Sequence, residues 1–182
     1  MKFMIASDIH GMASFCGKML EAFEGEGADR LVLLGDILYN GPRNAPPEGY
    51  GAQDAAAMLN ERAGRILCVR GNCDAEVDQA VLKFPIMADY CLLSLGERAV
   101  FVTHGHRFNR EAWPPLSRGD ILLCGHTHIP AWEKFGDGNL YLNPGSVSLP
   151  KADAWRGYML LTEREAVWKD LETGGARYAL TL

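Results

Sequence analysis

Short apolar runs that end in glycine, aspartate or histidine recur along this chain of 182 residues. In one of them, Ile121–Cys124 leads into Gly125-His126-Thr127-His128, and Pro130 closes the segment. An apolar run of this length before a tight loop is typical of a buried strand and its exit. Residues two apart in an extended chain point the same way, so both imidazoles are expected to face one point.

All five histidines lie in glycine-flanked stretches after apolar runs, namely His10, His104, His106, His126 and His128. Neighbouring neutral imidazoles at a strand end are most simply explained as metal ligands, because histidine is the commonest metal ligand. The alternative for His126 and His128 is a pair of surface histidines in a loop. Further candidate ligands elsewhere in the chain would favour the metal site over the surface loop.

The first seventy residues predict parallel strands joined by helices. The runs 2–7, 30–34 and 65–69 read as buried strands, and 12–24 and 53–62 have helical spacing or propensity. Strand–helix–strand units of this length imply right-handed crossovers, which bring the carboxyl ends of the strands to one edge. Asp8 and His10, Asp36, and Asn72 follow these three strands in turn.

Each of these polar residues also has an ordinary structural explanation. An aspartate such as Asp8 can cap a helix, and an asparagine such as Asn72 can simply form a turn. Their common position at one sheet edge favours a mixed carboxylate–imidazole site.

The second half of the chain predicts mainly strands, over 86–95, 99–103, 121–124, 131–135, 140–142, 158–162 and 166–170. Two sheets packed face to face, with helices outside, accommodate both halves in a single α/β domain over residues 1–182.

Composition limits the class of protein. The chain is 48% hydrophobic, yet no run approaches the roughly 18 apolar residues of a membrane span. The apolar start is too short for a secretory signal, so we expect a cytoplasmic protein with no membrane partner. The net charge of −5, without a basic stripe, disfavours extended nucleic acid as a partner. The five cysteines form no CxxC pair, and four of them lie in helix or strand patterns typical of reduced core residues, with Cys73 as the exception.

The strand-end side chains form one candidate metal set: Asp8, His10, Asp36, Asn72, His104, His126 and His128. Seven ligands exceed the needs of one tetrahedral zinc and suit two metals that share a bridging carboxylate.

The motifs Asp8-x-His10, Gly35-Asp36, Gly71-Asn72, His104-Gly105 and Gly125-His126-x-His128 resemble, in order and spacing, the signature motifs of the calcineurin-like metallophosphoesterases. Together with Asn143-Pro144-Gly145-Ser146, they are most similar to the small YfcE-type bacterial phosphodiesterases.

This resemblance implies a four-layer αββα sandwich of mixed sheets with the site at the carboxyl ends of the strands. It also implies that Asp8, His10 and His128 hold one metal, that Asn72, His104 and His126 hold the other, and that Asp36 bridges them. Mn²⁺ is the implied ion, and the oxygen and nitrogen ligands also suit Zn²⁺, Fe²⁺, Co²⁺ or Ni²⁺.

One position departs from the family pattern. Many members have a histidine after Gly-Asn that is thought to protonate the leaving group, and this chain has Cys73. A thiol is a poor substitute acid, so we expect weak assistance to poor leaving groups. His106 could take that role in part, or could instead contact the substrate or a ligand.

The predicted reaction is attack on phosphorus by a hydroxide that bridges the two metals. Asp36, Asn72, Cys73 and His106 are the catalytic candidates. Two dications, two carboxylates and the hydroxide leave about one positive charge, which favours a small phosphodiester over a dianionic monoester. Asn40 and Arg43, in the loop 39–50, are candidate substrate contacts, although an ordinary surface loop explains them equally well.

Three alternatives stay open at this point. Phosphomonoesterases and nucleases share the implied superfamily, and a retromer subunit shares the fold as a protein-binding scaffold with an impaired site. The intact ligand set argues against the scaffold. Homo-oligomer formation is also left open by the sequence.

Overall fold

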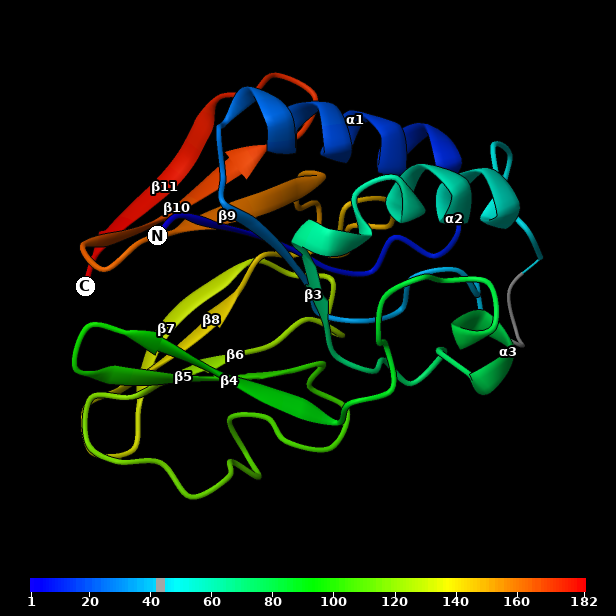
Figure 1. Ribbon diagram of the computed structural model, residues 1–182. Coiled ribbons are helices and arrows are strands. Elements are labelled where there is room, and N and C mark those ends of the chain that lie inside the picture. Colours follow the sequence, from blue (N-terminus) through cyan, green and yellow to red (C-terminus); the bar gives the residue numbers. More distant parts are fainter. Residues whose placement is uncertain (42–44) are drawn as a thin grey trace.

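Two mixed β-sheets pack face to face in the computed structural model, which describes residues 1–41 and 45–182 (Figure 1). The first sheet has the strand order β11-β10-β9-β1-β2-β3. Its strands are β1 (Phe3–Ala6), β2 (Arg30–Leu33), β3 (Ile66–Cys68), β9 (Gly157–Leu161), β10 (Glu165–Asp170) and β11 (Ala176–Thr181). The β1–β2 and β2–β3 pairs are parallel, and the pairs of β9 with β1 and with β10 are antiparallel.

The second sheet has the order β4-β5-β6-β8-β7. Its strands are β4 (Tyr90–Leu95), β5 (Arg98–Thr103), β6 (Ile121–Leu123), β7 (Ala131–Phe135) and β8 (Asn139–Asn143). The central pairs, β5–β6 and β6–β8, are parallel. Both sheets are therefore mixed, and the predicted two-sheet α/β sandwich is confirmed.

The central strand β1 shows why the sheets stack. All four of its residues are buried, so it reads as a continuous apolar run. Met4 and Ala6 pack into the core beneath the helices, and Phe3 and Ile5 pack into the core between the sheets. Alternate side chains of one strand thus enter two different cores.

Within residues 1–41 and 45–182, helices cover only one outer face of the sandwich. α1 (Ala13–Gly25) and α2 (Ala52–Asn60) lie over the first sheet, and α1 buries Cys16, Met19, Leu20 and Phe23 against it (Figure 1). On the outer face of the second sheet, Phe108 and Leu116, from an irregular segment, pack against Phe101 and Tyr141. The fourth layer is thus made of loop where helix was predicted.

Three local expectations need correction. The strand predicted over 86–95 begins at Tyr90, because Ile86 is buried in the core beneath the helices and its amide donates to the Gln79 side chain. The final strand β11 was missed; it is an edge strand with mainly exposed side chains. Two short helices, η1 (Ala63–Arg65) and α3 (Glu76–Gln79), were also not predicted.

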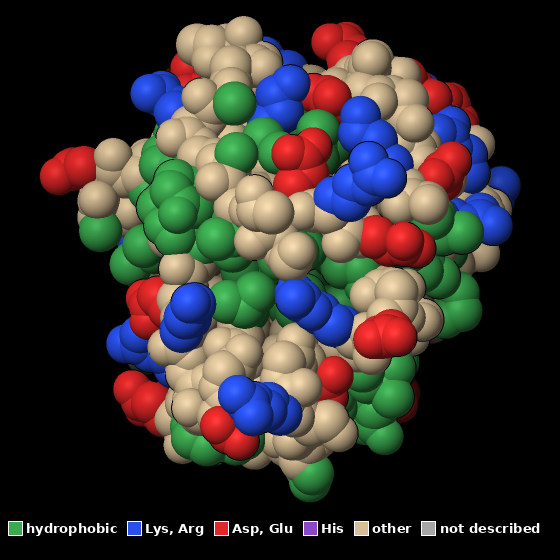
Figure 2. All heavy atoms as spheres, turned by 90° about the vertical axis from the view of Figure 1, so that its left-hand side faces the viewer, with side chains coloured by type: hydrophobic (Ala, Val, Ile, Leu, Met, Phe, Trp, Pro, Cys, Tyr) green, Lys and Arg blue, Asp and Glu red, His purple; other side chains and the backbone are tan. Residues whose placement is uncertain are grey.

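The polar motifs and the chain termini lie at different ends of the molecule. Figure 2 shows the face nearest the termini, where charged and apolar side chains are interspersed and no histidine is visible. The motifs follow the carboxyl ends of β1, β2, β3, β5 and β6. No helix in the described part of the chain is long and apolar enough to span a membrane.

Glu26, at the end of α1, ties this helix to the first sheet. Its carboxylate accepts a hydrogen bond from Tyr158 Oη at 2.9 Å, pairs with Lys169 and lies 3.5 Å from Lys2 Nζ. Burial by itself raises the pKa of Glu26, but Lys169 and Tyr158 outweigh burial and lower it.

We predict that Glu26→Gln lowers the free energy of unfolding by about 1–2 kcal/mol at pH 7, because bonds to a charged group are lost. The pKa of Glu26 is lower in the folded state than in the unfolded state, where it is near 4.5. Ionised Glu26 therefore stabilises the fold at pH values above 4.5, and this contribution is lost as the pH falls through the folded-state pKa. Urea titrations at pH 7 and pH 3.5 measure both effects. Glu21→Gln, at an exposed position of the same helix, is the control. An equal loss at both pH values would contradict this assignment.

Candidate metal centre

Most of the predicted ligands occupy left-handed backbone conformations. The φ angles are 59° at Asp8, 49° at His10, 56° at Asp36, 66° at His126 and 62° at His128. The sequence argument assumed an extended chain at the strand ends, and that assumption is wrong. The side chains converge because the backbone coils as it leaves each strand. Aspartate and histidine are among the few residues other than glycine that adopt this conformation readily.

Three buried side chains form a first cluster. Asp8 Oδ1 lies 3.6 Å from His10 Nε2 and 3.2 Å from His128 Nε2, and the two nitrogens are 3.4 Å apart. The other ring nitrogens are occupied, because His10 Nδ1 donates to the Tyr39 carbonyl at 2.8 Å and His128 Nδ1 donates to the Leu149 carbonyl at 2.6 Å. Both Nε2 lone pairs therefore face Asp8.

This first cluster fits a metal ion. Asp8 Oδ1 is fully buried and accepts no hydrogen bond from any residue that the structure describes. Ligands about 2.1 Å from a common ion lie about 3.0–3.4 Å from one another in octahedral or tetrahedral geometry. The separations in the cluster are close to this range. Asp8 Oδ1 and the two Nε2 atoms each offer an electron pair toward the others, and no hydrogen bond joins Asp8 Oδ1 to either nitrogen. A cation between them would satisfy all three.

A second cluster lies beside the first. His104 Nε2 is 3.0 Å from Asn72 Oδ1 and 3.2 Å from His126 Nδ1. His104 Nδ1 donates to the Leu34 carbonyl at 2.7 Å, which directs its Nε2 lone pair into the cluster. Asn72, His104 and His126 are thus grouped as the resemblance implied.

Asp36 lies between the two clusters. Its Oδ2 is 3.6 Å from His10 Nε2 and 3.5 Å from His104 Nε2, one nitrogen from each cluster. Its Oδ1 accepts the Cys73 amide at 2.8 Å, which fixes the carboxylate plane. This is the geometry expected of a carboxylate that bridges two ions.

Two glycines of the motifs allow this close approach. A Cβ at Gly71 would lie 2.1 Å from Asp36 Oδ1, and a Cβ at Gly35 would lie 2.3 Å from the Gly71 nitrogen. Either side chain would push the loop after β2 away from the loop after β3. The glycine in each motif therefore leaves the space that Asp36 needs to lie between the two loops.

Asp74 holds the same two loops together and was not assigned a role from the sequence. Its buried carboxylate accepts the amides of Asp36, Ile37 and Gly71 at 2.9, 2.8 and 2.7 Å. One carboxylate thus fixes the backbone on both sides of the bridging residue. No sequence signal separates such an aspartate from an ordinary turn residue.

The motif Asn143-Pro144-Gly145-Ser146 supports the loops after β1 and β6. Asn143 Nδ2 donates to the Gly125 carbonyl at 2.7 Å, and Ser146 Oγ donates to the Asp8 carbonyl at 2.9 Å. Ser148 Oγ donates to the same Asp8 carbonyl at 3.0 Å. These residues position ligands without joining either cluster.

The electrostatics of the site favour a cation. Burial by itself raises the pKa of Asp8, but His10 and His128 outweigh burial and hold it well below its usual value. Burial lowers the pKa of His104, but Asp36 and Asp8 outweigh it and raise the pKa to about 9. Two ionised carboxylates therefore create a field that favours positive charge between the histidines.

The clusters open into a cavity of about 810 Å³. Its lining includes His10, Asp36, Asn72, His126 and His128. Asn40 also lines it, and its side chain donates to the Ala45 carbonyl at 2.9 Å. Arg43, the other candidate substrate contact, lies outside the described residues.

Two further cations, Lys151 and Arg156, line this cavity and were not predicted. They follow Pro150 in a segment without a recognisable motif, so only the folded chain brings them to the site. Two other arginines that follow strands of the site are engaged elsewhere: Arg70 Nε donates to the Asp74 carbonyl, and Arg107 pairs with Asp89.

The two proton-donor candidates occupy different places. Cys73 lines the cavity, and burial together with the Asp36 charge raises the pKa of its thiol to about 12. The His106 ring centroid lies 5.4 Å from that of His104 and 6.2 Å from that of His126, and His106 is not among the residues that line the cavity. Burial and these two histidines lower the pKa of His106, which keeps it neutral near pH 7.

Comparison with known proteins agrees with this geometry. The profile of the calcineurin-like phosphoesterase superfamily domain matches residues 1–166. The chain belongs to this superfamily. Membership makes the protein a hydrolytic phosphoesterase and implies divalent metal ions, which the cluster of Asp8, His10 and His128 fits.

A phosphodiesterase from Escherichia coli, YfcE, is a close relative within the calcineurin-like superfamily. It is 48% identical over 161 residues, which cover 88% of this chain and 87% of YfcE. The solved structure of YfcE, described as a phosphoesterase from E. coli, superimposes with a TM-score of 0.94 at 43% identity, over 99% of this chain and 98% of that one. The predicted metallophosphoesterase fold is confirmed.

Vps29 from Entamoeba histolytica shares the fold at greater distance. Its zinc complex matches with a TM-score of 0.62 at 19% identity, over 100% of this chain and 99% of that chain. At this level of identity the match shows the calcineurin-like fold alone.

We predict that Asp74→Asn weakens metal binding and the fold together. An amide nitrogen would face backbone donors, and one unpaired buried donor costs about 1–3 kcal/mol. Calorimetric titration with Mn²⁺ measures the affinity, and urea unfolding of the metal-free protein measures the stability. Asp137→Asn, in the exposed β7–β8 turn, is the control. Unchanged Mn²⁺ affinity in Asp74→Asn would contradict the positioning role.

Proposed function

We propose that the protein is a metal-dependent phosphodiesterase that hydrolyses small phosphodiesters at a dinuclear site. The main support is the arrangement of six donors in two clusters around the shared carboxylate of Asp36. The 48% identity to an E. coli phosphodiesterase supports the choice of phosphodiesters among phosphate esters. Mn²⁺ is our first choice of ion, since nitrogen and oxygen ligands of this kind accept it.

Each cluster has a separate role in this proposal. Asp8, His10 and His128 would hold one ion, and Asn72, His104 and His126 would hold the other, with Asp36 shared. Two bound divalent ions supply an activated water as the nucleophile and offset negative charge on the phosphoryl oxygens. The protein's own contribution is to fix the spacing of the donors and the opening of the cavity above them.

Positive side chains at the cavity favour an anionic substrate. Lys151 lines the cavity and makes no side-chain hydrogen bond or ion pair with any described residue. Arg156 donates to the Ser148 carbonyl at 3.1 Å and pairs with Glu172 at 3.2 Å, so its position is fixed. Lys151 is therefore the more available cation for a phosphate oxygen or a charged group of the substrate.

A scaffold without catalytic activity is the less favoured function. A scaffold that merely inherited this site from an enzyme would tolerate loss of its ligands. Here all seven ligand positions are occupied by suitable side chains. The buried, unpaired Asp8 Oδ1 is costly to keep unless a metal ion uses it.

We predict that Asp36→Asn abolishes hydrolysis of bis(p-nitrophenyl) phosphate, with at least about a hundredfold loss, because the bridging charge is removed. Wild type and variant are assayed with Mn²⁺, Zn²⁺, Mg²⁺ and no metal, and with p-nitrophenyl phosphate as the monoester. Asp137→Asn is the control, and calorimetry reports the number of ions bound. Retained turnover in Asp36→Asn refutes the bridging role, and faster hydrolysis of the monoester than of the diester refutes the substrate class.

A second prediction concerns Cys73. We expect Cys73→His to raise the rate on diesters of weakly acidic alcohols by about tenfold or more, since a positioned general acid typically contributes 10²–10⁴-fold. Rates on p-nitrophenyl diesters, which need little protonation, should change less. Cys73→Ser, which supplies no useful acid, is the matched control. An equal change on both classes of substrate would contradict this role for the position.

A further inference from the structure

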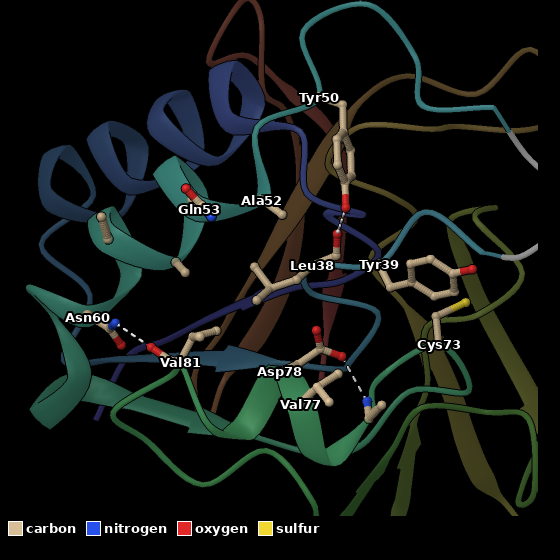
Figure 3. A pocket seen from close by; sticks show the side chains of 13 residues that line it. Leu38, Tyr39, Tyr50, Ala52, Gln53, Asn60, Cys73, Val77, Asp78 and Val81 are labelled. Carbon is tan, nitrogen blue, oxygen red and sulfur yellow. Dashed lines mark hydrogen bonds between the residues drawn. The ribbon is translucent and has the colours of Figure 1, made fainter.

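A second cavity, of about 640 Å³, borders the metal centre and has no role in the function proposed so far. Figure 3 shows it between α2, α3 and the segments that carry Leu38, Tyr39 and Cys73. Its lining is mainly apolar, and includes Leu38, Tyr39, Tyr50, Ala57, Val77 and Val81. The volume is within the range of about 300–1,000 Å³ typical of small-molecule sites.

Cys73 joins this cavity to the metal centre, because it lines both. Its Sγ lies within 4.8 Å of a ring nitrogen of His10 and a carboxylate oxygen of Asp36. Tyr39 also connects the two, since its carbonyl accepts the hydrogen bond from His10 Nδ1 and its side chain, like Cys73, lines the second cavity (Figure 3). A substituent on a phosphate at the metal centre has only to pass Cys73 to enter this cavity.

Three polar side chains of the lining, Asn60, Tyr50 and Asp78, already make hydrogen bonds within the protein. Asn60 donates to the Val81 carbonyl at 2.8 Å and accepts the Lys83 amide at 2.7 Å. Tyr50 Oη donates to the Leu38 carbonyl at 3.1 Å. Asp78 accepts the Ala75 amide at 2.8 Å, and its carboxylate disfavours an anion in the cavity. The chemistry of the lining therefore selects a neutral and largely apolar group.

Apolar side chains at the mouth point to the same kind of occupant. Val77 is 74% exposed and Val81 is 55% exposed, although both are aliphatic residues next to a cavity. Tyr39 and Tyr50 add ring surfaces to the lining, and α2 contributes the small side chains of Ala52, Ala56 and Ala57. A flat hydrophobic group would cover these side chains and remove their surface from water.

We infer that this cavity binds an apolar, aromatic ester group of the diester whose phosphate lies at the metal centre. The inference rests on the proposed function and narrows its substrate class to diesters with one aromatic ester group. The second ester group would then lie on the side of the metal centre that faces Lys151. Cys73 is then the passage between the phosphate site and the aromatic site.

The test uses two methyl phosphodiesters that differ in one group. p-Nitrophenyl methyl phosphate carries an aryl group, and hexafluoroisopropyl methyl phosphate carries a small alkyl group with an acidic alcohol. Ala57→Leu narrows the cavity and Val77→Asp places a charge in it. Both positions are exposed, so neither change removes core packing. Glu21→Leu, on the exposed side of α1, is the control for an added leucine.

We expect each cavity variant to lower the ratio of kcat/KM for the aryl diester to kcat/KM for the alkyl diester about tenfold, mainly through KM for the aryl diester. Glu21→Leu should leave this ratio unchanged. An unchanged ratio in both cavity variants overturns the inference.

A binding measurement separates this inference from the proposed function. Phenol is titrated into the full-length chain loaded with Mg²⁺, and the methyl resonances of Val77 and Val81 are followed by NMR. We expect saturable shifts at these methyls that weaken in Ala57→Leu; their absence overturns the inference. If the wild type hydrolyses neither diester with any metal, the proposed function fails, and the phenol titration still decides whether the cavity binds aromatic groups.

Discussion

The carboxylate of Asp36 is the point on which the rest of the site depends. One of its oxygens faces a histidine from each cluster, and the other is held by the Cys73 amide. Its own amide is held by Asp74, and the glycines Gly35 and Gly71 let the two loops meet around it. The spacing of the two ligand clusters is therefore set by backbone contacts, which are less adjustable than side-chain rotamers.

Both sheets contribute ligands to each cluster. The first combines Asp8 and His10, which follow β1, with His128, which follows β6. The second combines Asn72, which follows β3, with His104 and His126 from the other sheet. The packing of one sheet on the other thus determines the spacing of the candidate ligands. Trp168 of the first sheet, fully buried, donates to the Asn143 carbonyl of the second at 2.7 Å and is one contact that maintains this register.

The sequence predicted the elements that carry a strong local signal and missed those set by tertiary contacts. Apolar runs before Asp8, Asp36 and His126 were long enough to mark strands, and their order predicted which polar side chains the fold brings together. Asp74 and Lys151 were missed because each acts through neighbours that are distant in sequence. The loop layer over the second sheet, packed through Phe108 and Leu116, lacks the periodicity on which a sequence argument depends. The cavity beside Cys73 likewise exists only once α2 and α3 are in place.

The left-handed backbone at five ligand positions limits how the site can change. Glycine, asparagine, aspartate and histidine tolerate this conformation, whereas other side chains pay a steric cost of about 1–2 kcal/mol at each position. Replacing His126 or His128 with cysteine to favour a softer metal, or Asp8 with glutamate to lengthen its reach, would oppose the backbone as well as the coordination geometry. A change in the candidate ligands at these positions would therefore require rebuilding the strand exits as well as exchanging side chains.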